Sequence, residues 1–357
     1  MNLLMMGSFD GCVCGESVYN HYLKAYLRKR SNVNVSYICT DITGEGQQLS
    51  GGFKIGKVMR MMTVYASFVK RIFDVDVIYI TPGLTTFGIA RFLPVYFLSM
   101  IFGVKTISHY HGSRLVNTLG RGFVGGLFLR IIKKIDANIF LSDSLMCDYE
   151  LVYGDLKNSY VVPNGIPDEY YQKNDDVACG SSLKVLYLGN LIESKGVYDA
   201  VNSTIELKKM GVDVSLDIVG KGVGRILEDV KTHALKYNFI SYLGPLYGKE
   251  KLLVLRNSDV LLFPSTYDQE AFPLVVLEAM ASSCLVISYD VGAVKDMVSD
   301  SGVICESNVE SIVKNVLKYT ASKEEVLIMK EKAYRRAMDF KIDDALAQLE
   351  SIICAKK

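Results

Sequence analysis

Short aliphatic and β-branched runs alternate with longer helical stretches along the whole chain. Six such runs precede residue 164: "NLLMMG", "VNVSYICT", "DVIYIT", "KTISHYH", "ANIFLS" and "SYVVP". Six more begin at residue 183: "LKVLYLG", "VSLDIVG", "ISYLG", "VLLFPS", "LVISYD" and "GVIC". Strands that alternate with helices at this spacing indicate parallel sheets with helices on both faces. The pattern predicts an α/β protein with two Rossmann-like, doubly wound domains.

A segment rich in Pro, Gly, Asn, Asp and Ser separates the two series. Its sequence, "VVPNGIPDEYYQKNDDVACGSSLK", is typical of a linker and sets the boundary near 166–182. We therefore predict a first domain at 1–166, a second at 167–335, and a last segment at 336–357 that carries a helix. Ligands of doubly wound sheets bind outside the carboxyl ends of the strands. The residues that follow each strand are therefore the candidates for function.

Composition and charge fit a globular protein whose two halves differ. Half of the 357 residues are hydrophobic, and the formal net charge is +1. Residues 1–163 hold 17 Lys and Arg against 11 Asp and Glu, whereas the remaining residues hold 23 against 28. A basic first half fits either an anionic membrane surface or a solvated face, and charge alone favours the second.

The cysteines and the apolar runs give no sign of secretion or of a membrane span. Eight cysteines form no CxxC pair, as expected for reduced thiols of a cytosolic protein. Cys12 and Cys14 have no nearby histidine or further cysteine that would complete a metal site. The N-terminus reads as a first strand and not as a signal peptide. The longest apolar stretch (92–104) is shorter than the roughly 20 residues that span a bilayer.

The stretch "DQEAFPLVVLEAMA" carries two glutamates eight positions apart. Pro273 fits the first turn of a helix, where its missing N–H costs nothing, so Glu270 lies in the preceding loop and Glu278 inside the helix. Free N–H groups from about Phe272 to Val275 would form an anion site assisted by the helix dipole. A ligand whose diphosphate binds there, and whose hydroxyls on either side donate to the two carboxylates, would be a nucleotide-sugar. The alternative is a helix-stabilising acid followed by a surface glutamate, but the apolar neighbours of Glu278 favour function.

Two further stretches place candidate residues directly after strands. In "LYLGNLIESKG", Lys195 follows the strand at the same sheet edge as Glu270, where it can neutralise a leaving phosphate. In "KTISHYHGSR", strand alternation puts His109 and His111 on one face, with His111 nearer the loop. We expect a hydrogen-bonding or catalytic imidazole at His111; a metal held by the pair is disfavoured because no carboxylate accompanies it.

The N-terminal stretch "GSFDGCVCGESVYNHYL" is a strand-to-helix turn in which Gly15 would begin the first helix. A glycine there lets the backbone approach a phosphate or an acceptor. The glycine spacing, G-x3-G-x3-G, is not the dinucleotide fingerprint. The "DVD" at 74–76 precedes a strand, which is the wrong sheet edge for a metal-binding motif, so we expect it to be structural.

Together these motifs resemble the family-4 glycosyltransferases of the GT-B fold, a retaining and metal-independent class. The E-x7-E pattern is present as "EAFPLVVLE", followed by "AMA". "VVPNGI" resembles the domain junction, "GNLIESKG" resembles G-R-L-x-x-x-K-G, and "SHYHGSR" resembles the histidine loop. The resemblance covers nearly the whole chain, most specifically 186–304 and most loosely 40–100. It implies two Rossmann-like domains whose parallel sheets face each other across a cleft, with the last helix crossing back towards the first domain.

Carried over by position, the resemblance assigns roles to individual residues. Glu270 would contact the donor sugar, Glu278 the ribose, and His111 the sugar near its reacting carbon. Lys195 and the helix N–H groups would hold the diphosphate. The expected catalytic residues are His111, Glu270 and Lys195, and the expected donor-binding residues are Gly15, Gly189, Asn190, Lys195, Glu270, Ala271, Phe272, Pro273, Leu274, Val275 and Glu278.

Two departures from the family pattern bear on these roles. Asn190 stands where the family often has arginine, which leaves Lys195 as the one expected side-chain cation on the diphosphate. "SSCLVIS" (282–288) lacks the usual glycine and proline, and we expect an effect on the local backbone only.

The resemblance implies transfer of a hexose-type sugar from a nucleotide-sugar, with retention and without a metal or other cofactor. A UDP-sugar is the expected donor and a GDP-sugar the second choice. Front-face attack assisted by the leaving phosphate is the expected route, so Glu270 has no covalent role. The expected acceptor is a lipid-linked glycan of surface polysaccharide (O-antigen or capsule) biosynthesis, with no nucleic acid involved. A nucleotide-sugar epimerase, which would need further acid-base groups, and a non-catalytic nucleotide-sugar-binding protein, supported by Asn190, are the alternatives.

Basic, apolar helices in the first domain suggest a membrane surface as a further partner. The stretches are "KIGKVMRMMTVYASFVKRIF", "RFLPVYFLSMIFG" and "LFLRIIKK". An interfacial helix that approaches a lipid-linked acceptor has this composition. The alternative is that these helices pack on the sheet with solvated basic ends. We expect a cytoplasmic protein with peripheral contact to anionic lipid at the inner face of the cytoplasmic membrane.

Overall fold

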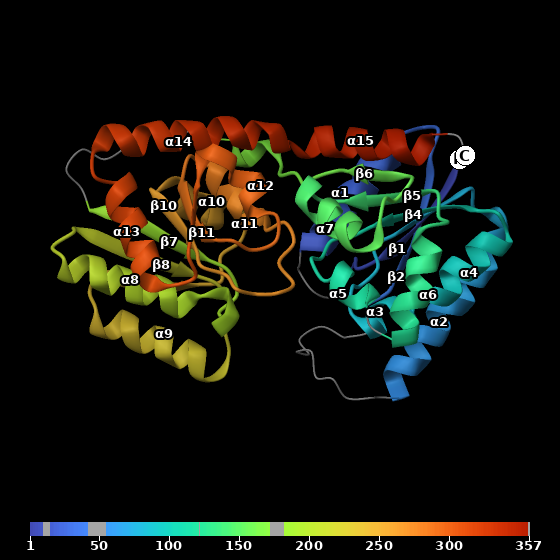
Figure 1. The fold of residues 1–357 in the computed structure, drawn as a ribbon, viewed down its shortest axis with the longest axis horizontal. Coiled ribbons are helices and arrows are strands. Elements are labelled where there is room, and N and C mark those ends of the chain that lie inside the picture. Colours follow the sequence, from blue (N-terminus) through green and yellow to red (C-terminus); the bar gives the residue numbers. More distant parts are fainter. Residues whose placement is uncertain (10–14, 42–54, 121, 172–181, 356–357) are drawn as a thin grey trace. The chain divides into compact units, whose positions relative to one another are not determined.

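The computed structural model describes residues 1–9, 15–41, 55–120, 122–171 and 182–355. The chain divides into two compact units, Met1–Asn164 with Asp344–Lys357, and Gly165–Asp343. Each unit contains one six-stranded parallel sheet (Figure 1). All twelve strands that the sequence predicts are present, each within its predicted run. The expected α/β class is confirmed.

The first sheet has the strand order β2-β1-β3-β4-β5-β6. The chain passes from β1 outward to β2 and then returns to β3 on the other side of β1, so the winding reverses between β1 and β3. The carboxyl end of such a reversal is where doubly wound sheets bind ligands. The strands are β1 (Asn2–Gly7), β2 (Asn34–Cys39), β3 (Val77–Ile80), β4 (Lys105–His109), β5 (Ala137–Phe140) and β6 (Ser159–Val161).

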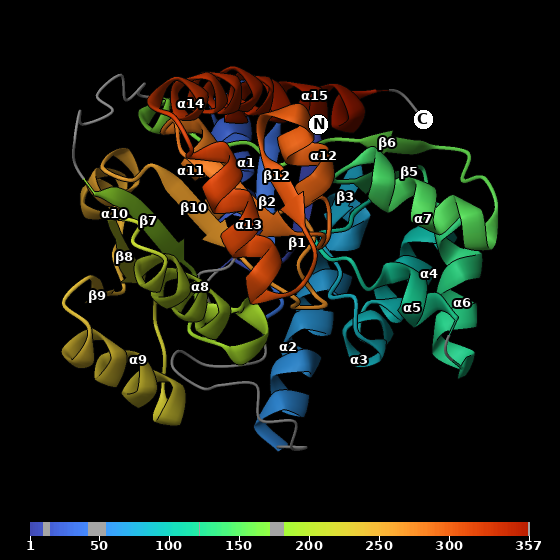
Figure 2. The same ribbon diagram turned by 60° about the vertical axis from the view of Figure 1, so that its left-hand side comes forward.

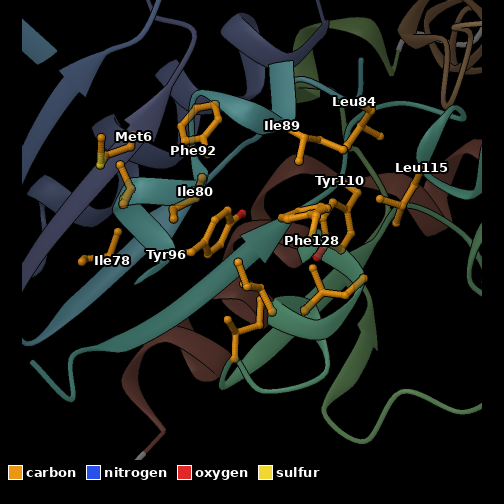
Figure 3. Close-up of a cluster of buried hydrophobic side chains, with 14 of the residues drawn as sticks. Met6, Ile78, Ile80, Leu84, Ile89, Phe92, Tyr96, Tyr110, Leu115 and Phe128 are labelled. Atoms are coloured by element: carbon orange, nitrogen blue, oxygen red, sulfur yellow. The ribbon is translucent and has the colours of Figure 1, made fainter. Parts of the chain in front are cut away.

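One face of the first sheet packs on a core of aliphatic and aromatic side chains (Figure 3). Met6, Ile78 and Ile80 from the strands meet Phe92 and Tyr96 in this core. The Tyr96 hydroxyl shares a 2.7 Å hydrogen bond with Ser108 Oγ, so its polar end is satisfied in the interior. The helices are α1 (Gly15–Arg28), α2 (Ile55–Arg71), α3 (Thr86–Ala90), α4 (Leu93–Ile101), α5 (Leu115–Leu119), α6 (Gly122–Ile132) and α7 (Asp143–Tyr153), with the 3-10 turn η1 (Ile72–Asp74).

The C-terminal helix α15 (Ile342–Cys354) is tied to the first sheet by a buried lysine. Lys105 Nζ donates to the carbonyl oxygens of Ile352 at 2.7 Å, Ile353 at 3.1 Å and Ala355 at 2.7 Å. The last carbonyls of a helix have no partners within it, and a cation there complements the dipole. This contact explains why residues from Asp344 onward belong to the first unit.

The second sheet has the strand order β12-β11-β10-β7-β8-β9. Its winding reverses between β7 and β10, so the loops that follow these two strands share the switch point. The strands are β7 (Leu183–Leu188), β8 (Val214–Val219), β9 (Ile240–Gly244), β10 (Val260–Phe263), β11 (Leu285–Tyr289) and β12 (Val303–Cys305).

Helices cover both faces of the second sheet, because right-handed crossovers in opposite directions place α8 and α11 on opposite faces. α8 and α13 lie side by side (Figures 1 and 2), and α11 contacts α14. The helices are α8 (Val197–Lys209), α9 (Gly224–Lys236), α10 (Gly248–Arg256), α11 (Leu274–Ala281), α12 (Val294–Val298), α13 (Val309–Tyr319) and α14 (Lys323–Ala337). The 3-10 turns are η2 (Asp168–Tyr170), η3 (Glu193–Lys195), η4 (Ser299–Ser301) and η5 (Met338–Phe340).

The turn from α11 to β11 contains the departure from the family pattern at "SSCLVIS". Ser283 has a φ of 59°, in the left-handed region that favours glycine and costs another residue about 1 kcal/mol. The Leu285 N–H donates to the Asp259 carbonyl at 2.9 Å, a bond that a proline at 285 would remove. The absence of glycine and proline from this turn therefore has two local effects. Ser283 adopts a left-handed conformation, and Leu285 keeps a backbone N–H that donates a hydrogen bond.

Candidate functional site

The loops that follow β7 and β10 are joined at the switch point of the second sheet. The Thr266 N–H donates to the Ser194 carbonyl at 2.8 Å, and the Thr266 hydroxyl donates to the same oxygen at 3.2 Å. These bonds hold the turn with Lys195 against the loop with Glu270. The two loops that sequence analysis singled out therefore form one surface.

Lys195 and Glu270 form a largely buried ion pair between these loops. Lys195 Nζ donates to Glu270 Oε1, and Glu270 is 9% exposed. Lys195 Nζ also lies 5.3 Å from the centroid of the Tyr267 ring, within cation–π range. A buried ion pair is weak evidence for stability alone. The sequence predicted that both residues lie at this edge, but not that they bind each other.

Tyr187 fixes the turn that carries Gly189 and Asn190. Its buried hydroxyl donates to the Asn190 carbonyl at 3.1 Å. Burial, and then the negative charge of Glu270, raise the pKa of Tyr187, so its hydroxyl stays protonated. The Asn190 carbonyl also accepts from the Ile192 N–H at 2.9 Å, while the Asn190 side chain is exposed. The contact of Asn190 and Gly189 with a diphosphate stays a prediction.

Two glycines allow the close backbone contacts of this surface. Gly196 has a φ of 76°, and a Cβ on it would lie 2.0 Å from the Pro264 carbonyl oxygen. Gly292 has a φ of 53°, and a Cβ on it would lie 2.5 Å from the Glu270 carbonyl oxygen. Sequence analysis noted Gly196 only as part of a motif and missed Gly292, which follows the end of β11 by three residues.

Helix α11 starts beside the ion pair. Pro273, with φ −70° and ψ 114°, is the residue just before the helix, and the helix begins at Leu274. We expected Pro273 inside the first turn, so the helix starts one residue later than predicted. Ala271, Phe272 and Pro273 are buried. The first N–H groups of a helix, here from Leu274 and Val275, have no acceptor within it and carry the positive end of the dipole. The expected location of an anion site is therefore present at this helix start.

Glu278 lies inside α11 as expected, but it is not a surface residue. It is 6% exposed, its Oε1 accepts from Lys251 Nζ at 2.6 Å, and its Oε2 accepts no hydrogen bond of normal geometry from the described residues. Burial raises the pKa of Glu278, whereas the charge of Lys251 and hydrogen bonding by Lys251 and Tyr170 lower it. The alternative of an exposed glutamate is wrong. Lys251 and Tyr170 were missed, because nothing in the sequence separates Lys251 from a surface lysine.

In the first unit, His109 and His111 project from the same face of the chain, as expected. Their ring centroids are 4.1 Å apart, and Tyr79 Oη shares a 2.7 Å hydrogen bond with Nδ1 of the fully buried His109. Both ring nitrogens of His111 are buried and have no hydrogen-bond partner among the described residues. Burial lowers the pKa of His111 to about 3, so its imidazole is neutral near pH 7. It can exchange hydrogen bonds with a ligand but does not supply a positive charge.

Gly15 begins α1, as expected, and Glu16 follows it at the switch point of the first sheet. None of the described residues lies within 4 Å of a Cβ built on Gly15, so no contact with them requires glycine there. Glu16 Oε1 accepts from Thr81 Oγ1 at 2.7 Å and from the Ser8 N–H at 3.1 Å. Burial raises the pKa of Glu16. Glu16 is a candidate that sequence analysis did not assign.

The remaining expectations concern metals, thiols and membrane spans. Within the described ranges, no three His, Cys, Asp or Glu side chains gather as a metal site. Cys12 and Cys14 lie outside the described residues, and the five cysteines inside them form no disulfide. Asp76 Oδ2 accepts from the Asn2 N–H at 2.7 Å at the amino ends of the strands, so "DVD" has a structural role. No helix in the described part of the chain has both the length and the apolarity needed to cross a bilayer.

Comparison with known proteins relates the second unit to a family. Residues 173–336 match the family described as "Glycosyl transferases group 1". Glycogen synthase of Mycobacterium tuberculosis is 26% identical over 227 residues, which are 59% of this chain and 53% of the relative. Phosphatidyl-myo-inositol mannosyltransferase of Propionibacterium freudenreichii is 26% identical over 182 residues, covering 50% and 44%. The chain thus spans about half the length of these curated relatives.

Comparison with solved structures concerns the fold. HepE of Anabaena, solved in complex with UDP, has a TM-score of 0.76 and 14% identity over 98% of this chain and 99% of that one. Sucrose-phosphate synthase of Thermosynechococcus elongatus has a TM-score of 0.78 and 15% identity over 99% and 98%. The chain therefore has the GT-B fold of these structures, and its segment 173–336 matches the family described as glycosyl transferases group 1.

The close approach at Gly196 yields a prediction with a matched control. Gly211 has a similar φ of 85°, but nothing lies within 4 Å of its Cβ position. Gly211→Ala should cost only the left-handed strain, about 1 kcal/mol. Gly196→Ala should cost about 2 kcal/mol more, because its methyl group displaces the Pro264 carbonyl. Thermal unfolding of both variants measures the difference, and equal shifts in Tm would contradict the close contact.

Proposed function

We propose that this protein is a retaining glycosyltransferase that moves a hexose-type sugar from a nucleotide-sugar to an acceptor. The observation that carries the proposal is the Lys195–Glu270 pair beside the start of α11, at the switch point of the second sheet. This surface lies in the segment that matches the glycosyl transferases group 1 family. The names of the relatives, a glycogen synthase and a mannosyltransferase among them, support the class.

In the proposed complex, the diphosphate occupies the start of α11. Lys195 turns from Glu270 to the phosphate, which releases the Glu270 carboxylate to accept hydrogen bonds from sugar hydroxyls. Glu278 accepts from the ribose, and the turn at Gly189 and Asn190 lies against the diphosphate. HepE was solved with UDP and with UDP-glucose, which supports a UDP-sugar as the first donor to test and a GDP-sugar as the second.

The proposed chemistry follows from these charges and needs no metal. Lys195 and the helix N–H groups stabilise the negative charge that grows on the leaving diphosphate. The acceptor hydroxyl attacks from the same face and passes its proton to that phosphate, so the anomeric configuration is kept. Neutral His111 of the first unit exchanges a hydrogen bond with the sugar. Glu270 has no nucleophilic role.

The proposal is tested by turnover of UDP-glucose and GDP-mannose with site variants. Lys195→Met and Glu270→Gln should each lower transfer or donor hydrolysis at least about 100-fold, since each removes a contact to the charge or the sugar of the transition state. His111→Ala should lower turnover while leaving UDP affinity nearly unchanged. NMR of the released sugar should show the donor's anomeric configuration.

Exposed Lys249→Met and Glu250→Gln on α10 are the matched controls and should keep wild-type turnover. Full activity in the Glu270 and His111 variants would refute the site. Tight nucleotide-sugar binding without any turnover would instead favour the non-catalytic binding protein.

We further propose that the first unit docks on an anionic membrane through an apolar–basic surface on α2, η1 and α4. Phe68 and Ile72 pack into the core, as expected if these helices cover the sheet. Met59, Met62, Val69 and Phe73 follow one helical stripe and are exposed by 63%, 59%, 46% and 69%. The Phe73 and Phe102 rings meet at 5.0 Å and join this stripe to exposed Phe97, Ile101 and Phe102 on and after α4.

The excess of basic residues in this region indicates anionic lipid as the partner of the apolar–basic surface. Residues 46–135 hold 12 Lys and Arg but only two acidic residues, Asp74 and Asp76. Basic groups beside exposed apolar side chains fit an interfacial helix on anionic lipid. We propose that such docking brings the protein to a lipid-linked glycan acceptor at the cytoplasmic face.

Co-sedimentation with phosphatidylglycerol vesicles tests the membrane proposal. The protein should pellet at low salt and be released by high salt, because lipid charge is screened. Met59→Ser with Met62→Ser should weaken binding at least about tenfold, through lost apolar burial. The control pair Leu235→Ser with Leu253→Ser, exposed by 90% and 60% on the second unit, should bind normally. No pelleting at low salt, or equal weakening by both pairs, would overturn it.

A further inference from the structure

The two oxygens of the Glu278 carboxylate have different surroundings. Oε1 accepts from Lys251 Nζ at 2.6 Å, whereas Oε2 is buried and accepts no hydrogen bond of normal geometry from the described residues, although the Tyr170 hydroxyl faces the carboxylate. Glu278 as a whole is 6% exposed. Buried polar atoms in folded proteins almost always have partners, so an unpartnered carboxylate oxygen calls for an explanation. A hydroxyl of a bound ligand would supply the missing donor.

Lys251 is held in place from two sides and is not a loose surface cation. It lies on α10, Glu278 on α11, and Tyr170 on η2. Lys251 Nζ contacts the Glu278 carboxylate and also lies 5.2 Å from the centroid of the Tyr170 ring. Tyr170 is itself buried. Three separate elements therefore fix one carboxylate orientation.

We propose that Lys251 is a positioning residue that holds Glu278 ionised, with Oε2 directed to accept a hydrogen bond from a ribose hydroxyl of the nucleotide. This inference rests on the proposed function, in which Glu278 contacts the ribose. Lys251 occupies one oxygen of the carboxylate and leaves the other to the ligand. It thereby sets how strongly the protein prefers a ribonucleotide over a nucleotide without ribose hydroxyls.

A pH profile separates this role from a merely structural ion pair. The groups that face Glu278 are the Lys251 ammonium from α10 and the Tyr170 hydroxyl from η2. Burial raises the pKa of Glu278, and the Lys251 charge opposes that rise. Removing Lys251 should raise the pKa further, so a larger fraction of Glu278 would be protonated at a given pH than in wild type, and a neutral carboxyl is a weaker acceptor than a carboxylate. The rise of ribonucleotide affinity with pH should then lie at higher pH in Lys251→Met than in wild type, because the carboxylate ionises at higher pH in the variant.

Calorimetric titration of the full chain with UDP and with 2′,3′-dideoxy-UDP, and with the GDP pair in parallel, tests the inference. Wild type should bind the ribonucleotide at least about tenfold more tightly than its dideoxy form, because the dideoxy form leaves Oε2 unpaired. In Lys251→Met that ratio should fall to about one to two. Lys251→Arg should restore most of it, and exposed Lys249→Met should leave it unchanged.

The outcomes separate this inference from the proposed function. If wild type binds neither UDP nor GDP, the proposed function fails. If wild type binds a nucleotide but shows no dideoxy penalty, or if Lys251→Met keeps the full penalty and the wild-type pH profile, only the present inference fails. If Lys251→Met does not fold, the double variant Lys251→Met with Glu278→Gln is measured instead, because it no longer carries the uncompensated charge of Glu278. The double variant should fold, bind the nucleotide and show a ratio near one, and an undiminished ratio would overturn the inference.

Discussion

The buried ion pair between Lys195 and Glu270 is the interaction on which the candidate site depends. It joins the loop after β7 to the loop after β10, the two loops that meet where the winding of the second sheet reverses. Two opposite charges away from water gain little net stability from each other. They do, however, keep a cation and a carboxylate beside the start of α11. A diphosphate and a sugar need these two groups at that place.

The backbone around the pair is arranged to keep this geometry. Gly196 and Gly292 let neighbouring chains approach to distances that a side chain would prevent, and Tyr187 holds the turn next to Glu270. Burial and nearby charges affect the protonation of Glu278 in the second unit, and burial keeps His111 in the first unit neutral. Glu278 has Lys251 against it, whereas His111 has no charged partner in the described part of the chain and stays neutral. The second unit thus carries carboxylates with defined cationic partners, and the first unit carries an uncharged imidazole.

The sequence predicted the elements well, and it predicted individual contacts poorly. Every strand was visible because buried parallel strands are short β-branched or aliphatic runs, and Pro273 located the start of α11 to within a residue. The Lys195–Glu270 and Lys251–Glu278 pairs could not be predicted, because the two residues of each pair lie on different elements. They are 75 positions apart in the first pair and 27 in the second. Likewise, composition left open whether α2 is buried or exposed, and the structure shows Phe68 buried and Met59 exposed on the same helix.

The central claim is that a nucleotide diphosphate binds at the start of α11 and takes Lys195 from Glu270. A crystal structure of the protein with UDP tests it most directly. The account predicts phosphate oxygens within hydrogen-bond distance, about 3 Å, of the Leu274 or Val275 N–H and of Lys195 Nζ, with Glu270 Oε1 released. UDP bound elsewhere, or bound with Lys195 still paired to Glu270 and distant from the phosphates, would contradict it.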